Sequence, residues 1–102
     1  MKIKLERKGG FTGIPRKFSF DLDHLEAADK ERLQAAVEAA DFFDLPHLIP
    51  APNTGVDQFH YVITIHEGKR RHVVQTSEPD IPEALQALIN EVLHEGRVVK
   101  NR

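Results

Sequence analysis

The chain has 102 residues, of which 40% are hydrophobic and 29% charged, which is the size and composition of one globular domain. We therefore predict a single domain over residues 1–102. The absence of cysteine excludes disulfides and thiol catalysis, and is typical of a cytoplasmic protein. With 14 Lys and Arg against 16 Asp and Glu, the chain as a whole offers no electrostatic attraction to nucleic acid or anionic lipid, so we expect no nucleic-acid partner. Its apolar runs are far shorter than the roughly 20 residues that span a bilayer, so we expect no membrane partner.

Two alternating segments predict a first hairpin. The alternating apolar positions are Met1, Ile3 and Leu5 in the first segment and Phe18, Phe20 and Leu22 in the second. Period-2 alternation is typical of half-buried strands. The segment between them, GGFTG at residues 9–13, contains three glycines, which tolerate the positive φ angles of a tight turn.

A change of period predicts a helix over residues 27–40. Its apolar side chains recur at spacings of three and four, at Leu33, Ala36, Val37 and Ala40. Residues 23–26 have the spacing of a capping box but also suit the exit turn of the preceding strand. The helix ends in FFDLP at 42–46, because the residue before a proline disfavours the α conformation. These two phenylalanines and the leucine either plug the core or contact a partner.

The second half of the chain repeats the pattern of hairpin and helix. Residues 59–66 alternate, EGK at 67–69 makes a turn, and residues 71–76 form the partner strand. The register stays open, because a shift by one residue exchanges the faces of Val73 and Val74. A second helix is expected to begin at Asp80 and stop at Gly96, followed by a frayed tail. Its apolar stripe consists of Ile81, Leu85, Leu88, Ile89 and Val92.

The predicted order is strand, strand, helix, strand, strand, helix. The simplest arrangement is an α+β fold, in which two hairpins form a four-stranded antiparallel sheet and both helices pack on one face. The aromatic residues of the strands then serve the core rather than a base-stacking platform, because the helices need an apolar surface to cover.

The histidines do not predict a metal site. His60 and His66 share one face of a strand, with His72 available from its neighbour, but six residues along a strand separate the two imidazoles by about 20 Å. His94-Glu95 lacks the second histidine of an H-E-x-x-H pair. We therefore predict neither a metal nor a cofactor.

No group of residues predicts catalysis. The glycine-rich turn leads into a strand, whereas phosphate-binding loops lead into a helix. The acid pairs, Asp21 with Asp23 and Asp41 with Asp44, fall at helix boundaries, where carboxylates commonly act as caps. No nucleophile or histidine relay accompanies them. The sequence thus indicates a protein that is not an enzyme.

Two segments are candidates for contact with a partner. Phe11 lies at the tip of the glycine turn, where a large apolar side chain either folds back into the core or anchors a partner. The basic residues that bracket this turn, which would suit an acidic partner, are Arg7, Lys8, Arg16 and Lys17. The second candidate is the proline-rich segment 47–58, which has the profile of a functional loop.

Four motifs in a fixed order resemble the emfourin family: RKGGFTG at 7–13, FFDLP at 42–46, DQFHYVI at 57–63, and Pro82 with Leu85 and Leu88 in the last helix. That family consists of small cytoplasmic inhibitors of thermolysin-like zinc metallopeptidases, the protealysin group in particular. The sequence departs from the family pattern at Lys8, where a small hydroxyl residue is common, and at Thr12, where alanine is common. Both departures concern target preference and potency more than fold.

The resemblance implies a stoichiometric inhibitor that blocks the active-site cleft of a thermolysin-like metallopeptidase. Such enzymes accept bulky apolar side chains just after the scissile bond, so a turn that presents Phe11 would fill that pocket. The partner-binding residues expected on this basis are Gly9, Gly10, Phe11, Thr12 and Gly13. The alternative is a non-catalytic adaptor or assembly module, which would form a stable complex without reducing any protease activity.

Overall fold

The computed structural model describes residues 1–9, 15–50, 58–78 and 80–100. The strands are β1 (Lys2–Gly9), β2 (Arg16–Asp21), β3 (Phe59–Glu67) and β4 (Arg70–Ser77). The helices are α1 (Ala27–Ala39) and α2 (Glu83–Lys100), with two short 3-10 helices, η1 (Leu22–His24) and η2 (Phe42–Asp44). The order ββαββα confirms the predicted α+β fold.

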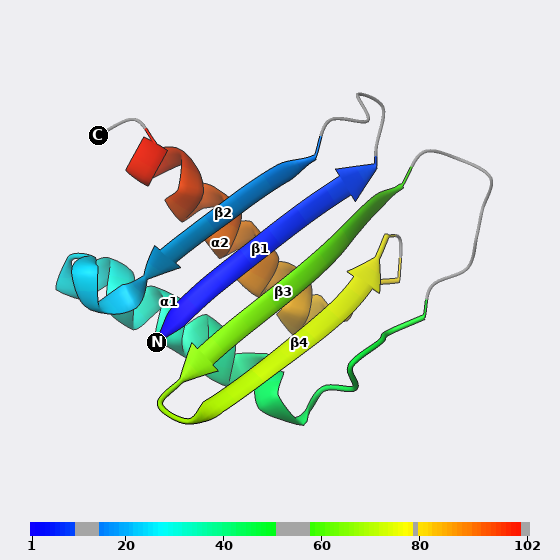
Figure 1. Cartoon of the computed structure of the whole chain (residues 1–102), viewed down its shortest axis with the longest axis horizontal. Coiled ribbons are helices and arrows are strands. Elements are labelled where there is room, and N and C mark those ends of the chain that lie inside the picture. The colour runs from blue at the N-terminus through cyan, green and yellow to red at the C-terminus, as the bar shows by residue number, and fades with distance from the viewer. Residues whose placement is uncertain (10–14, 51–57, 79, 101–102) are drawn as a thin grey trace.

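The four strands form one antiparallel sheet in the order β2-β1-β3-β4 (Figure 1). The two predicted hairpins, β1-β2 and β3-β4, are therefore joined through β1 and β3 at the centre. The register places Ile3 opposite Phe20 on one side and opposite Ile65 on the other. This pairing aligns the apolar positions of neighbouring strands on the same face.

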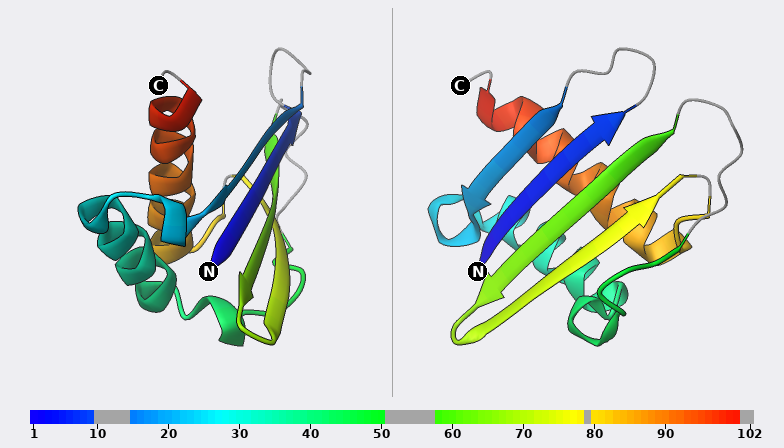
Figure 2. Two further views of the ribbon diagram at one scale, coloured as in Figure 1. Left: turned by 60° about the vertical axis from the view of Figure 1, so that its left-hand side comes forward. Right: turned by 45° about the vertical axis from the view of Figure 1, so that its right-hand side comes forward.

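Both helices cover the same face of the sheet, as Figure 2 shows in its left view. The buried core lies between the two layers, and its members are Ile3, Leu5, Leu22, Leu33, Val37, Ala40, Phe42, Tyr61, Ile63, Ile65, Val74, Leu85, Leu88, Ile89 and Val92. The predicted apolar residues of both helices contribute to it. At roughly 25 cal/mol per Å² of apolar area, this burial is the main stabilising term of the fold.

The opposite face of the sheet carries no helix and is called the open face below. It consists of the alternate strand residues, which are Lys2, Lys4, Glu6, Lys8, Lys17, Ser19, Asp21, His60, Val62, Thr64, His66, Arg71, Val73, Gln75 and Ser77. Figure 2 shows this side of the strands uncovered. The aromatic strand residues lie on the other face, as predicted.

The register of the second hairpin is settled by the pairing of Ile63 with Val74. Val74 is fully buried beneath the helices, whereas Val73 lies on the open face. The same register corrects the expected position of His72, which pairs with Ile65 and so lies on the helix side. Its Nε2 is 2.7 Å from the backbone oxygen of Leu45, which ties the segment after η2 to β4.

The outer edge of β4 is covered by residues 47–49. The Ile49 N–H donates to the Gln75 oxygen at 2.8 Å, and the Gln75 N–H donates to the His47 oxygen at 2.8 Å. These bonds form a parallel bridge between Leu48 and Gln75. Covering the unpaired backbone groups removes a site for unwanted strand pairing.

The connection between β2 and α1 differs from the prediction at Leu22. This residue belongs to η1 rather than to the second strand, and it is fully buried. The Asp21 carboxylate accepts a hydrogen bond from the Asp23 N–H at 3.0 Å, so residues 23–26 form the exit turn and not a capping box. After α1, Asp41 adopts a left-handed conformation with φ 50°, which turns Phe42 into the core at 1% exposure. Phe42 is thus the core plug.

The limits of α2 also differ from the prediction. The helix begins at Glu83, not at Asp80, and it continues through Gly96 to Lys100. The sequence suggested a glycine stop, but a Cβ on Gly96 would lie 2.3 Å from Cδ1 of Phe18. Gly96 therefore serves close packing of the helix on β2 rather than capping. No helix in the described part of the chain is long and apolar enough to cross a membrane.

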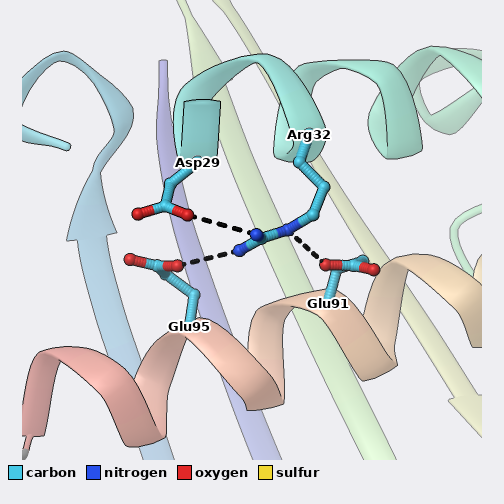
Figure 3. Close-up of polar contacts among 4 residues, drawn as sticks. All are labelled: Asp29, Arg32, Glu91 and Glu95. Atoms are coloured by element: carbon cyan, nitrogen blue, oxygen red, sulfur yellow. Dashed lines mark hydrogen bonds and ion pairs between the residues drawn. The ribbon is translucent and has the colours of Figure 1, made fainter. Parts of the chain in front are cut away.

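A charged cluster joins the two helices (Figure 3). The Arg32 guanidinium of α1 lies 3.1 Å from an oxygen of Asp29, 2.6 Å from Glu91 and 3.1 Å from Glu95, the last two on α2. The Glu95 side chain is fully buried, and its Oε1 has no hydrogen-bond partner among the described residues. Because an unpaired buried carboxylate is costly, Arg32 holds the helices together.

Candidate functional site

One edge of the sheet collects four strand ends and is called the loop edge below. β1 ends and β3 begins where Gly9 pairs with Phe59, and β3 begins beside the end of β4 where His60 pairs with Ser77 (Figure 1). β2 begins here too, at Arg16. The segments 10–14 and 51–57 therefore leave from neighbouring strands, and both lie outside the described residues. The described residues next to these segments, Gly9, Pro15 and Gln58, lie at this edge, whereas residues 47–49 of the second candidate lie along β4.

Gly9 forms the base of the glycine turn and accepts no other residue without strain. Its φ is 83°, a conformation that L side chains rarely adopt. A Cβ at this position would lie 2.4 Å from the backbone oxygen of Gln58. The backbones of β1 and β3 therefore approach so closely here that the position requires glycine.

Of the five predicted contact residues, Gly9 is described and stands at the loop edge. The other four, Gly10, Phe11, Thr12 and Gly13, lie outside the described residues, so their role stays a prediction. Their flanking residues, Gly9 and Pro15, place both ends of the turn at this edge.

A group of three side chains, which the sequence did not reveal, braces the loop edge. The Arg7 guanidinium carbon lies 4.5 Å from the centre of the Phe59 ring, a cation–π contact. The Phe59 N–H donates to Oε1 of Glu78 at 3.1 Å, and the Glu78 N–H donates to the Phe59 oxygen at 3.1 Å. The sequence contains one sign of this group, because Arg7 is a cation at a position of β1 where the alternation predicts an apolar residue. Its aromatic partner depends on the β1–β3 register.

Tyr61 lies directly beneath this brace. Its ring centre is 6.3 Å from that of Phe59, and only 4% of the residue is exposed. Burial, with a smaller contribution from the Glu78 carboxylate, raises the pKa of the Tyr61 hydroxyl. The phenol is therefore neutral at physiological pH and supports the loop edge as part of the core.

The loop edge is positively charged on its described residues. Lys8 Nζ lies 2.8 Å from one oxygen of Glu6, and Lys17 Nζ lies 3.9 Å from the other. The hydrogen bond from Lys8 is the main reason that the pKa of Glu6 lies below its ordinary value. With Arg7 and Arg16 added, four cations surround this edge, and they favour an acidic partner.

The described residues of this edge do not form a catalytic centre. Nδ1 of His60 lies 2.6 Å from Oγ of Ser77, but no carboxylate in the described part of the chain hydrogen-bonds the imidazole. A histidine that activates a serine is normally oriented by such a third group. No cluster of three metal-ligating side chains occurs among the described residues either.

A hollow of about 310 Å³ opens at the opposite end of the sheet, between the end of α1, η2 and the β3–β4 turn. Arg70 lines it, with its guanidinium carbon 4.0 Å over the Phe43 ring and an ion pair to Glu67. The Arg70 guanidinium and the Phe43 ring are therefore already engaged in contacts within the chain. We therefore place the functional site at the loop edge.

The fold is a two-layer α+β domain whose candidate site lies at one end of a four-stranded sheet. The Emfourin family model matches residues 5–93, which include most of the chain. The chain belongs to the Emfourin family, the protealysin inhibitors that act on thermolysin-like metalloproteases, and it is a protease inhibitor rather than an enzyme. No curated protein and no solved structure matches the chain.

Proposed function

We propose that the loop edge enters the active-site cleft of a thermolysin-like metallopeptidase, a protealysin-type enzyme in particular, and blocks it at a ratio of one to one. Gly9, Gly10, Phe11, Thr12 and Gly13 make the contact, with Phe11 as the apolar anchor. The observation that carries this proposal is the fit of Gly9 against Gln58. It fixes one end of the turn to the central strands.

Strand ends that are already held in place favour inhibition, because ordering a mobile segment on binding costs free energy. The hydrogen bonds between Phe59 and Glu78, with Arg7 stacked on the ring, hold the strand ends before any partner arrives. A bound turn whose backbone is held by the sheet also resists the movement that cleavage requires. The basic residues Lys8 and Arg16 would meet carboxylates at the rim of the cleft.

The test is a titration of a mature protealysin-type peptidase with the purified protein at increasing molar ratio. We expect activity to fall linearly to an endpoint near one to one. A stable complex without loss of activity would favour the adaptor function instead, and the absence of any complex with a folded, uncleaved protein would reject this target class.

The anchor is tested with Phe11→Ala against Phe43→Ala as matched control. Both substitutions remove one phenylalanine ring, but Phe43 lies at the opposite end of the sheet. We expect Phe11→Ala to raise the inhibition constant by about 30-fold or more, the effect of losing an interface hot spot of about 2 kcal/mol. Phe43→Ala should leave it unchanged. Equal constants for the two variants, with both folded by circular dichroism, would contradict the anchor role.

A further inference from the structure

The open face of the sheet carries a charge that the chain as a whole does not have. Its residues include five cations, Lys2, Lys4, Lys8, Lys17 and Arg71, against two carboxylates, Glu6 and Asp21. The whole chain has 14 cations and 16 carboxylates, so the remainder has nine against fourteen. The open face is thus basic and the rest of the sequence is acidic, although the net charge is only -2.

The cations farthest from the loop edge form no ion pair with the residues that the structure describes. Lys8 and Lys17 share Glu6, but no carboxylate of the described residues forms an ion pair with Lys2, Lys4 or Arg71. Lys2 and Arg71 lie on either side of His66 across β1, β3 and β4, and Asp21 of β2 pairs with Lys2 from the other side. Surfaces that serve solubility alone intersperse the two signs, whereas this face has an excess of cations.

This part of the open face is hollowed. A shallow depression of about 600 Å³ is lined by Lys2, Lys4, Ser19, Phe20, Asp21, His24 and His66. It combines two ammonium groups with the hydroxyl of Ser19 and two imidazoles, all of which can donate hydrogen bonds to carboxylate oxygens. The one carboxylate that lines it, Asp21, already accepts the N–H of Asp23.

We propose that the open face is a second protein-binding surface, which takes a carboxylate-rich segment of a protein partner at the hollow between Lys2, Lys4 and His66. Lys2 and Gly9 are the first and last residues of the eight-residue strand β1. At about 3.3 Å per residue, the hollow lies roughly 20 Å from the loop edge. The hollow at Lys2 and Lys4 is therefore separate from the loop edge, although Lys8 and Lys17 belong to both surfaces, and this inference does not require the loop edge to act on a peptidase.

A protein segment fits this face better than a nucleic acid does. Single-stranded nucleic acids bind through stacking of bases on aromatic rings as well as through phosphate contacts. The register turns the strand aromatics Phe18, Phe59 and Tyr61 toward the helices, which leaves Phe20 at the β2 side of the hollow as the one strand aromatic among the residues that line it. A single partly buried ring is not the row of stacking rings that single-stranded nucleic acids use. A second copy of this chain is also disfavoured, because a symmetric dimer through this surface would bring the same cations of the two copies together.

The experiment titrates the full chain with an octaglutamate peptide and follows the backbone amides by NMR at low salt. We expect shifts at Lys2, Lys4, Ser19 and His66, and weaker binding as salt is raised from 50 to 200 mM. The double variant Lys2→Glu/Lys4→Glu should weaken binding by about tenfold or more, since each exposed ion pair is replaced by a repulsion. Its matched control is Lys69→Glu, an exposed lysine of the β3–β4 turn, which should bind like the unmodified chain.

Four results would overturn the proposal. The first is an equal loss of octaglutamate affinity in the double variant and in Lys69→Glu, and the second is a set of NMR shifts spread over every lysine. The third is tighter binding of a single-stranded oligonucleotide of equal charge than of the peptide. The fourth is self-association of the chain that the double variant abolishes. The double variant should also inhibit a peptidase as well as the unmodified chain. A loss of inhibition would make the open face part of the peptidase interface and not a second surface, whereas an unmodified chain that fails to inhibit affects only the proposed function.

Discussion

The two faces of the sheet are built from the same strands and have opposite physical roles. On the helix-covered face, Ile3, Leu5 and Ile65 are at most 1% exposed and supply stability. On the open face, Lys2 and Lys4 alternate with them along β1, stay exposed and lack ion-pair partners among the described residues. Because strand side chains alternate, the sequence can change one face without disturbing the other. The residues that supply stability are therefore separate from the charged residues of the open face.

The largest effect is expected from the charged cluster above the covered face. Arg32→Ala would leave the fully buried Glu95 without its cation, at a cost of about 3 kcal/mol in the free energy of unfolding. Urea denaturation measures this change. The control Arg32→Met/Glu95→Met removes both charges and should recover most of the stability, because apolar replacements of a buried ion pair are often tolerated. Equal losses in the two variants would mean that packing, not charge, joins the helices.

The second largest effect on stability is expected at Gly9, the last residue of β1 at the loop edge. Gly9→Ala combines a positive φ of 83° with a Cβ 2.4 Å from the Gln58 oxygen, whereas Gly68→Ala has a φ of 60° and open space around it. We expect about 1 kcal/mol for Gly68→Ala and at least about 2 kcal/mol for Gly9→Ala in urea denaturation. Similar values would show that the close approach to Gln58 adds no strain.

Most of the fold follows from the periodicity of the sequence. The alternation around Ile3 and Ile63 and the helical spacing of Leu85 and Leu88 identify every strand and both long helices, because each element buries one face. The errors occur where tertiary contacts decide. Gly96 has the local signature of a helix stop, but Phe18 lies against it from a strand far away in the sequence.

The candidate site was predictable to a smaller extent. The glycine turn and the basic residues around it are visible in the sequence, and the family match confirms the inhibitor function that the resemblance implied, while the contact role of the turn stays a prediction. The brace of Arg7, Phe59 and Glu78 was not predictable, since it joins three strand ends whose register is set by the whole sheet. Lys2, Lys4 and Arg71, which form no ion pair with the described residues, were not predictable as a group for the same reason.

A smaller effect, of opposite sign, is expected on the covered face at Thr76. The residue is 2% exposed, and its Oγ1 has no hydrogen-bond partner among the described residues. Thr76→Val keeps the shape and removes a buried hydroxyl, so thermal and urea unfolding should show a gain of about 1 kcal/mol. The control is Thr64→Val on the open face, where the hydroxyl is partly solvated and the change should stay near zero. A loss at Thr76 would indicate a partner for its hydroxyl, such as a bound water.

The smallest effect on stability is expected at Glu6, which belongs to the open face. The hydrogen bond from Lys8 lowers its pKa below the ordinary value of 4.5 in the folded state. The resulting stabilisation is complete above pH 4.5 and is lost as pH falls through the lowered pKa. Urea denaturation between pH 7 and pH 2 should therefore show a shallower acid loss for Glu6→Gln than for the unmodified chain.

Glu6→Gln also tests whether the charge of the open face controls the binding of an acidic peptide. Glu6→Gln removes the counter-ion that Lys8 and Lys17 share, so the open face gains one net positive charge while the core is untouched. Octaglutamate should then bind more tightly, although the protein is slightly less stable at neutral pH. Asp23→Asn is the control, because the pKa of Asp23 is likewise lowered, chiefly by Lys30, but its carboxylate lies on η1 and not on the open face. If both variants strengthened binding equally, net charge rather than the open face would attract the peptide.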